Sequence, residues 1–252
     1  MKIINVDYHN IDREHICCAI TDRKGESCAS LKKAWMMERF DEGLIFKKLD
    51  VRGKVFIEYI PAENAWCPVE AAGYMFISCF WVSGQFKGQG YGNKLLEECI
   101  RDSKMHGKKG LVILSSKKKM PFLSDPKYLK YKGFQLCDVA DPYFELLYLP
   151  FEKDAEKPRL KECCKKGVVD KMGIVLYYSN QCPHTEKYAI MIAKIADIEG
   201  LDFTLIKYKT KEQAQNSPAP FTTYSLFYDG KFVTNEVLSE KKFRNFLAER
   251  GL

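Results

Sequence analysis

The residues best suited to chemistry form a glycine-rich loop. An apolar run from Tyr74 to Val82 precedes this loop and predicts a buried strand, while the segment from Asn93 to His106 carries apolar residues at helical spacing. In such a loop, glycines let the backbone approach a ligand, and the helix that follows directs unpaired N–H groups and the positive end of its dipole at the loop. The segment therefore predicts a phosphate-binding site. Its residues are Gln85, Phe86, Lys87, Gly88, Gln89, Gly90, Tyr91 and Gly92.

The glycine spacing decides between kinds of phosphate ligand. A dinucleotide loop requires Gly-x-Gly-x-x-Gly, but after Gly88 and Gly90 the third glycine position is Asn93. A nucleotide-triphosphate loop requires Gly-Lys-Ser/Thr, and none follows. The remaining pattern, Gln-x-x-Gly-x-Gly after a strand ending in Phe80-Trp81-Val82, resembles the acyl-coenzyme A signature of the GNAT superfamily of N-acetyltransferases. The alternative is a glycine-rich turn that only reverses the chain.

The GNAT resemblance implies an activity and a co-substrate. The implied reaction transfers the acetyl group of acetyl-coenzyme A to a primary amine by direct attack, without a metal; the acceptor is a small-molecule or peptide amine of unknown identity. Phe80, Trp81 and Val82 would line the pantetheine arm, with the Val82 N–H as a candidate oxyanion donor. The residues of the glycine loop, 85–92, would hold the pyrophosphate.

The resemblance also implies a general base. GNAT enzymes often place a glutamate near the start of the central strand, and Glu70 stands closest to that point, with Glu58 and Glu63 as rivals. A carboxylate buried beside apolar neighbours has its affinity for protons raised, as a base near neutrality requires. A surface carboxylate without a chemical role is the alternative for each of the three.

The general acid departs from the family pattern. Family members commonly carry a tyrosine four residues before a Gly-Phe pair, but the residue four before Gly133-Phe134 is a leucine. Tyr128 and Tyr131 flank that leucine and are the candidates for protonating the leaving thiolate. Packing of either tyrosine against the core is the alternative.

A second group of predicted strands and helices follows a charge-rich stretch, which we interpret as a linker. It has a strand at Gly173–Tyr178, a helix opened by Cys182-Pro183-His184-Thr185, a strand at Asp202–Tyr208, a hairpin around Asp229-Gly230 and a closing helix at Ser239–Ala248. This small α/β unit resembles a thioredoxin-like domain. Together the two halves are similar to the YoaP type of GNAT protein, with an acetyltransferase domain at 1–150, a linker at 151–171 and a YoaP-like domain at 172–252.

Cys182 occupies the attacking position of a glutaredoxin-like Cys-Pro-x-x loop. The helix N-terminus is expected to favour its thiolate. The resolving cysteine is replaced by Thr185, so a local disulfide cycle cannot run, and the Thr185 hydroxyl is a possible partner for the thiolate. Two rival functions follow: a thiol-redox protein that uses Cys182, and a protein that binds acetyl-coenzyme A without turnover.

The remaining apolar patterns predict an α/β fold with a mixed sheet, in the order that the GNAT resemblance implies for residues 1–150. Strands are predicted at Lys2–Val6, Leu44–Leu49, Lys54–Ile60, Gly110–Leu114, Phe134–Val139 and Tyr143–Leu149, and helices at Ile11–Ile20, Ser27–Phe40 and Pro126–Tyr131.

Composition limits the other function classes. The 252 residues carry a formal net charge of +7, which suits a polyanionic co-substrate, but no basic stripe with interleaved aromatics indicates nucleic acid. No apolar stretch reads as a signal segment or is long enough to span a bilayer, so we expect a cytoplasmic protein. The ten cysteines are scattered through apolar contexts, which predicts reduced core residues and no zinc site.

Overall fold

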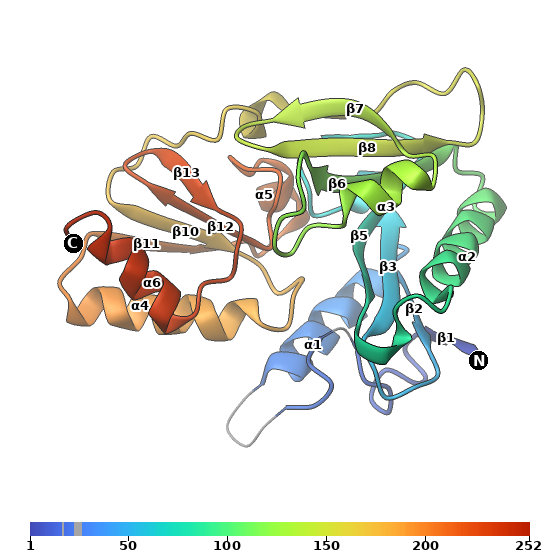
Figure 1. Cartoon of the computed structure of the whole chain (residues 1–252), viewed down its shortest axis with the longest axis horizontal. Helices are drawn as coiled ribbons and strands as arrows, with labels where there is room; N and C mark the ends of the chain where they lie inside the picture. The colour runs from blue at the N-terminus through green and yellow to red at the C-terminus, as the bar shows by residue number, and fades with distance from the viewer. Residues whose placement is uncertain (17, 23–26) are drawn as a thin grey trace.

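The structure, a computed structural model, describes residues 1–16, 18–22 and 27–252 (Figure 1). Its larger sheet has seven strands in the order β1-β2-β3-β5-β6-β8-β7. Neighbouring strands in this sheet are antiparallel except for the central pair, β5 and β6, which are parallel. The strands span Ile3–Val6 (β1), Ile45–Leu49 (β2), Val55–Pro61 (β3), Tyr74–Val82 (β5), Gly110–Ser116 (β6), Gln135–Ala140 (β7) and Phe144–Pro150 (β8).

The central strands diverge, and this opens the sheet. The pairing of β5 with β6 runs from Tyr74 opposite Gly110 to Ile77 opposite Ile113. Beyond that point β6 continues to Ser116 beside β8, while β5 continues to Val82 beside β3. The last five residues of β5 therefore extend past the end of the β5–β6 ladder, and the edge of β5 that faces β6 is open there.

Helices cover both faces of this sheet, because adjacent strand residues point to opposite sides. On one side Leu95 and Cys99 of α2 (Tyr91–Met105) pack with Ile57 and Met75, together with α3 (Pro126–Tyr131). On the other side α1 (Cys28–Phe40) packs against Phe56 and Phe76. Figure 1 shows α1 and α2 separated by the sheet.

A four-stranded sheet in the order β11-β10-β12-β13 forms the C-terminal part. The parallel pair β10 and β11 is joined by α4, and the antiparallel hairpin β12–β13 turns at Asp229-Gly230, where both residues have positive φ. Helices α4 and α6 contact each other and pack on one face of this sheet (Figure 1). The bounds are Ile174–Tyr178 (β10), Thr185–Ile198 (α4), Phe203–Lys207 (β11), Tyr224–Tyr228 (β12), Lys231–Thr234 (β13) and Glu240–Ala248 (α6).

The opposite face of the small sheet packs against the large one. Phe232 of β13 has its ring 6.0 Å from that of Tyr143 and 5.4 Å from that of Phe144. The core that contains Phe56 and Phe76 also includes Tyr208 and, from the short helix α5 (Lys211–Gln215), Ala214. One apolar cluster therefore runs through both parts of the chain.

The predicted helix at Ile11–Ile20 is wrong for the residues that the structure describes; residue 17 lies outside them. The backbone there forms turns, with the Ile11 N–H bonded to the Asp7 carbonyl at 2.9 Å. Side chains satisfy the local backbone: Asp7 accepts from the His9 N–H, and Asn10 accepts from the Asp7 N–H. Such local bonds compete with a helix.

The segment between the two sheets has its own structure. A short strand, β9 (Arg159–Leu160), pairs with β4 (Val69–Glu70), and a 3₁₀ turn follows at Glu162–Cys164. The domain limits proposed for 1–150, 151–171 and 172–252 stay predictions.

The sequence interpretation missed helix α5. Its signal is a Thr-x-x-Gln capping pattern, in which the Thr210 hydroxyl accepts from the Gln213 N–H.

Candidate active site

The glycine loop connects β5 to α2 in an open conformation. A 3₁₀ turn at Gly84–Phe86 follows the strand, and Gly88 and Gly90 then take left-handed φ values of 74° and 79°. Side chains rarely adopt this conformation, so glycine is required at both positions. A Cβ atom built on Gly88 or Gly90 would have no described heavy atom within 4 Å, so the backbone there is approachable.

The start of α2 presents its N–H groups to this loop. Gly90 caps the helix, and the Lys94 N–H donates to the Gly90 carbonyl at 3.2 Å. The N–H groups of residues 91–93 precede that bond and point out of the helix end. The loop thus combines approachable backbone with the positive end of a 15-residue helix, an arrangement that fits a pyrophosphate.

A cavity of about 540 Å³ lies between the loop, the end of β5 and α3. Its lining includes most of the residues predicted to hold coenzyme A. The exceptions are Gln85 and Gln89, which bond within the loop: the Gln89 side-chain amide donates to the Gln85 carbonyl at 2.5 Å. The predicted residues in the lining are Phe80, Trp81, Val82, Phe86, Lys87, Gly88, Gly90, Tyr91 and Gly92.

The Val82 N–H faces the open edge of β5. In an antiparallel pair, successive N–H groups of one strand alternate between its two edges. The Ser83 N–H donates to the Lys54 carbonyl at 3.1 Å, toward β3. The Val82 N–H therefore points to the other edge, where β6 has diverged.

Of the two predicted acids, Tyr128 lines the coenzyme A cavity and Tyr131 does not. The Tyr128 hydroxyl donates to Asn93 Oδ1 at 3.2 Å, and its ring meets that of Phe80 edge-on at 5.7 Å. Burial raises the pKa of Tyr128 to about 12, with a smaller contribution from the Glu97 charge. A Cβ atom on Gly92 would lie 3.3 Å from this hydroxyl, so Gly92 gives it room. Tyr131 is 82% exposed.

A second cavity, of about 430 Å³, adjoins the first. The two share Phe80, Trp81, Leu123 and Ser124, so they meet at the end of β5. Most of its surface is apolar. The described residues that line only the second cavity are Cys18, Glu58, Trp66, Cys67, Phe76, Ile77, Ser78, Cys79, Ile113, Leu114, Pro121, Phe122, Gln181, Cys182, His184, Pro220, Phe221, Thr222 and Thr223.

The structure places Glu58, rather than Glu70, at this second cavity. Glu58 is buried at an irregularity of β3; its Oε1 accepts from the Ser78 hydroxyl at 2.8 Å, and its Oε2 lies 2.6 Å from the Nζ of the buried Lys32. Glu70 lies on β4, partly exposed and paired with Arg159, outside both cavities.

The remaining rival, Glu63, also lies outside both cavities. It pairs with Lys108 at 2.8 Å, and about half of its side chain is exposed.

Cys182 also lines the second cavity, but the environment of its thiol differs from the prediction. Burial raises its pKa to about 12, which outweighs the opposite effect of a hydrogen bond from the His184 backbone. The backbone at the helix N-terminus thus lowers the pKa of this thiol, but burial has the larger effect, so the net shift opposes a thiolate. The Thr185 hydroxyl donates to the Ser179 and Cys182 carbonyls at 2.6 and 2.9 Å, so it bonds to the backbone of the loop rather than to the thiol.

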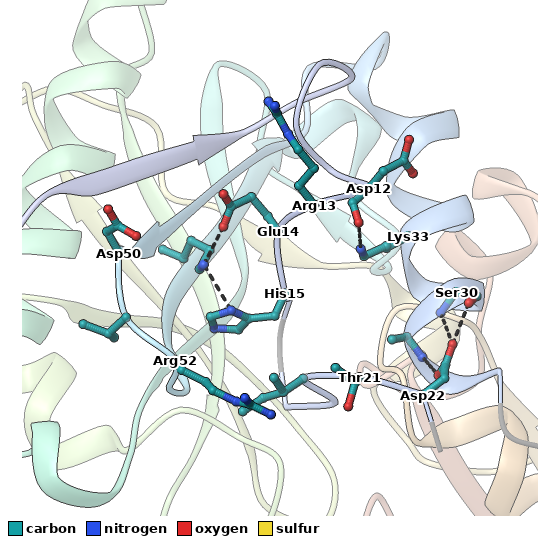
Figure 2. A pocket seen from close by; sticks show the side chains of 14 residues that line it. Asp12, Arg13, Glu14, His15, Thr21, Asp22, Ser30, Lys33, Asp50 and Arg52 are labelled. Carbon is teal, nitrogen blue, oxygen red and sulfur yellow. Dashed lines mark hydrogen bonds and ion pairs between the residues drawn. The ribbon is translucent and has the colours of Figure 1, made fainter. Parts of the chain in front are cut away.

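A third cavity, of about 620 Å³, is polar and separate from these two (Figure 2). Its charged groups engage one another: Lys48 lies 2.7 Å from Glu14 and 3.2 Å from His15. The Asp22 carboxylate accepts from the Ala29 and Ser30 N–H groups in the first turn of α1. The third cavity shares no described lining residue with the glycine-loop cavity, so it is not part of the candidate active site.

The central strands that diverge beside a glycine-rich strand-to-helix loop are features of the GNAT class of N-acetyltransferases. A curated protein of Bacillus subtilis, named "uncharacterized N-acetyltransferase YoaP", is 41% identical over 247 residues, which cover 98% of each chain. A family described as YoaP-like matches residues 202–245. The chain belongs to the YoaP-like GNAT N-acetyltransferases and is thus an acyltransferase.

Solved structures of two acetyltransferases are also similar to this chain. A GNAT-family acetyltransferase from Brucella melitensis in complex with acetyl-coenzyme A is 16% identical, with 62% of this chain and 91% of that one covered and a TM-score of 0.39. The PaiA N-acetyltransferase from Thermoplasma acidophilum in complex with coenzyme A is 16% identical, with 60% and 100% covered and a TM-score of 0.40. No helix within the described residues has the length and apolar character of a membrane span.

Proposed function

We propose that the chain transfers the acetyl group of acetyl-coenzyme A to a primary amine by direct attack, with Glu58 as general base and Tyr128 as general acid. The observation that carries the proposal is the meeting of two cavities at the end of β5. One cavity contains the glycine loop and suits the cofactor, while the other contains a buried carboxylate and suits an acceptor. A thioester held between them would be reached by an amine from the opposite side.

The chemical roles follow from these positions. The amine nitrogen forms the new C–N bond, the thioester C–S bond breaks, and the Val82 N–H stabilises the oxyanion that develops between these events. Glu58 takes the proton that the amine loses. Tyr128, whose pKa is raised to about 12, is protonated at neutral pH and donates a proton to the coenzyme A thiolate.

The rival redox function receives less support. A redox cysteine requires a thiolate near neutral pH. The raised pKa of Cys182 and the threonine at position 185 both oppose such a cycle.

Release of coenzyme A thiol across an amine panel tests the proposal, with the protein's own cysteines quantified as the blank. Glu58→Gln is expected to lower kcat by about 100- to 10,000-fold, because it removes the base. Its affinity for acetyl-coenzyme A, measured by calorimetry, should stay within about twofold, since Glu58 lies outside the coenzyme A cavity.

Two further variants separate chemistry from folding. Glu58→Gln removes the carboxylate that pairs with the buried Lys32, so the double variant Lys32→Met/Glu58→Gln, which removes both charges of this pair, should still be inactive. Glu70→Gln is the matched control at an exposed carboxylate of β4 and should keep full activity. A fully active double variant, or an inactive Glu70→Gln, contradicts the assignment of the base.

A further inference from the structure

We propose that the C-terminal part of the chain forms one wall of the acceptor site and selects a small monoamine with an apolar, aromatic body. This inference rests on the proposed function. Two loops of the small sheet line the second cavity, one after β10 with Gln181, Cys182 and His184, and one before β12 with residues 220–223. These loops lie at the same end of the sheet, because Tyr178 of β10 pairs with Tyr224 of β12.

Buried hydrogen bonds fix this wall to the larger sheet. The Trp66 carbonyl accepts from the Thr222 hydroxyl and, at 3.4 Å, from the side-chain amide of Gln181. The same amide donates to Thr222 Oγ1 at 2.8 Å. The Cys67 thiol donates to the Pro220 carbonyl at 3.4 Å. Both loops are thus held on one segment of the acetyltransferase part, and the position of the wall is defined.

A second set of contacts, outside the lining of the cavity, also holds the C-terminal part against the larger sheet. The side-chain amide of Gln215 donates to the Ala65 carbonyl at 3.0 Å, and Lys211 donates to Asn64 Oδ1 at 2.9 Å. Both donors belong to α5, which Figure 1 shows between the two sheets. The wall therefore belongs to a continuous interface and is not a chance contact of two loops.

The lining of the cavity indicates the chemistry of the acceptor. Glu58 is the one carboxylate among the described lining residues, and Lys32 already balances its charge. A polyamine would bury additional ammonium groups without a counter-charge, which is costly. Aromatic side chains instead offer contact to a flat apolar body. They are Trp66, Phe76, Phe80, Trp81, Phe122 and Phe221.

Cys182 is the side chain through which the wall limits the size of the acceptor. A neutral thiol behaves as a small apolar group. Cys18, Cys67 and Cys79 line the same cavity, so four thiols contribute soft apolar surface to it. A larger side chain at position 182 would occupy volume that the acceptor needs, while the coenzyme A cavity, which does not include this residue, would be unchanged.

The test uses the full chain, acetyl-coenzyme A and two probes, phenethylamine and spermidine. The wild type should prefer phenethylamine in kcat/KM by at least about tenfold, because the cavity supplies apolar contacts and lacks a second carboxylate among its described residues. Cys182→Phe should raise the KM for phenethylamine by about tenfold or more, with the KM for acetyl-coenzyme A within about twofold. Cys163→Phe, at an exposed thiol of the connecting segment, is the matched control and should change neither.

A variant that enlarges the cavity guards against a folding defect in Cys182→Phe. Phe221→Ala removes an aromatic ring from the same wall and should also raise the KM for phenethylamine, with acetyl-coenzyme A binding unchanged. A preference for spermidine, or unchanged phenethylamine KM values in both wall variants, overturns the inference while leaving the acetyltransferase function intact. Acetyl-coenzyme A binding without thiol release for any primary amine overturns the proposed function itself.

Discussion

In two places in this chain a strand is followed by a loop and the N-terminus of a helix, but the two loops differ in how exposed they are. After β5, the backbone passes through exposed glycines into α2, and Gly90 caps the helix in the left-handed conformation. After β10, the chain enters α4 through Cys182-Pro183-His184, and the buried Thr185 closes the turn with two hydrogen bonds. The first junction leaves N–H groups accessible, whereas the second borders the second cavity and its Thr185 side chain is fully buried.

The difference shows that a helix N-terminus does not by itself define a chemical site. Its dipole stabilises a nearby negative charge by about 0.3–1 kcal/mol when exposed. The same favourable field acts at both junctions, but at Cys182 the loss of hydration outweighs it and raises the thiol pKa to about 12. Exposure therefore decides which junction can receive an anion.

The largest expected effect comes from placing a bulky side chain in the glycine loop of the first junction. Gly90→Val places a β-branched side chain at a φ of 79° and in the path of the phosphates. We expect acetyl-coenzyme A affinity to fall by at least about 100-fold in calorimetric titrations, because the backbone can no longer approach the pyrophosphate. Gly200→Val is the matched control: Gly200, at the end of α4, has a φ of 67° and equally open surroundings. Equal loss in both variants would attribute the effect to general instability.

Tyr128→Phe tests the group that faces the start of α2. The variant keeps the ring contact with Phe80 but loses the hydroxyl, and we expect kcat to fall by about 100-fold. Tyr131→Phe, at an exposed ring, should have no effect.

The wild-type pH profile provides an independent test of Tyr128. A general acid must carry its proton, and a pKa of about 12 keeps Tyr128 protonated from pH 7 to well above pH 9. Deprotonation of this tyrosine should therefore cause no decline in kcat between pH 7 and 9. A decline with a midpoint near 9 that disappears in Tyr128→Phe would contradict the raised pKa.

Thiol labelling compares the second junction with a surface site. At pH 7.5 a pKa of about 12 leaves Cys182 with about 1,000-fold less thiolate than an ordinary thiol, for which the pKa is 9.0. Desolvation also raises the pKa of the exposed Cys163, so we expect iodoacetamide to modify it at least about tenfold, rather than 1,000-fold, faster than Cys182, as measured by peptide mass spectrometry. Faster labelling of Cys182 would show that the second junction does stabilise a thiolate, and the contrast between the junctions would fail.

The smallest expected effect concerns stability at high pH. The unfolded Cys182 thiol titrates near 9 and the folded one near 12, so the unfolded state loses this proton first as the pH rises. The thiol's contribution is therefore complete below pH 9 and declines between pH 9 and 12. At pH 10 the loss from this group is on the order of 1 kcal/mol. Urea unfolding at pH 8 and 10 should show a smaller decline for Cys182→Ala than for the wild type.

The first junction was predictable from the sequence because its signals are local. The apolar run of β5, the glycines and the helical spacing of α2 adjoin one another, and the structure contains all three elements. The base was not predictable in the same way. Glu58 lies at the register shift of β3 and pairs with Lys32, which comes from a helix 26 residues earlier, whereas Glu70 is closer to the central strand along the chain.

The environment of the Cys182 thiol could not be predicted from the sequence either. Its place before a helix is local and was predicted, but its partial burial depends on two distant parts of the chain that meet at the second cavity. Among the described residues of Ile11–Ile20 the predicted helix is absent, and the Asp7 and Asn10 side chains bond to the backbone of the turn just before this segment.

The apolar cluster that joins both sheets has a consequence for how the molecule unfolds. Tyr208 and Ala214 share a core with Phe56 and Phe76, and β9 of the connecting segment pairs with β4. Neither sheet can lose its order without exposing apolar surface of the other. The two parts are therefore energetically coupled, so that heating is expected to melt them in a single cooperative transition rather than one after the other.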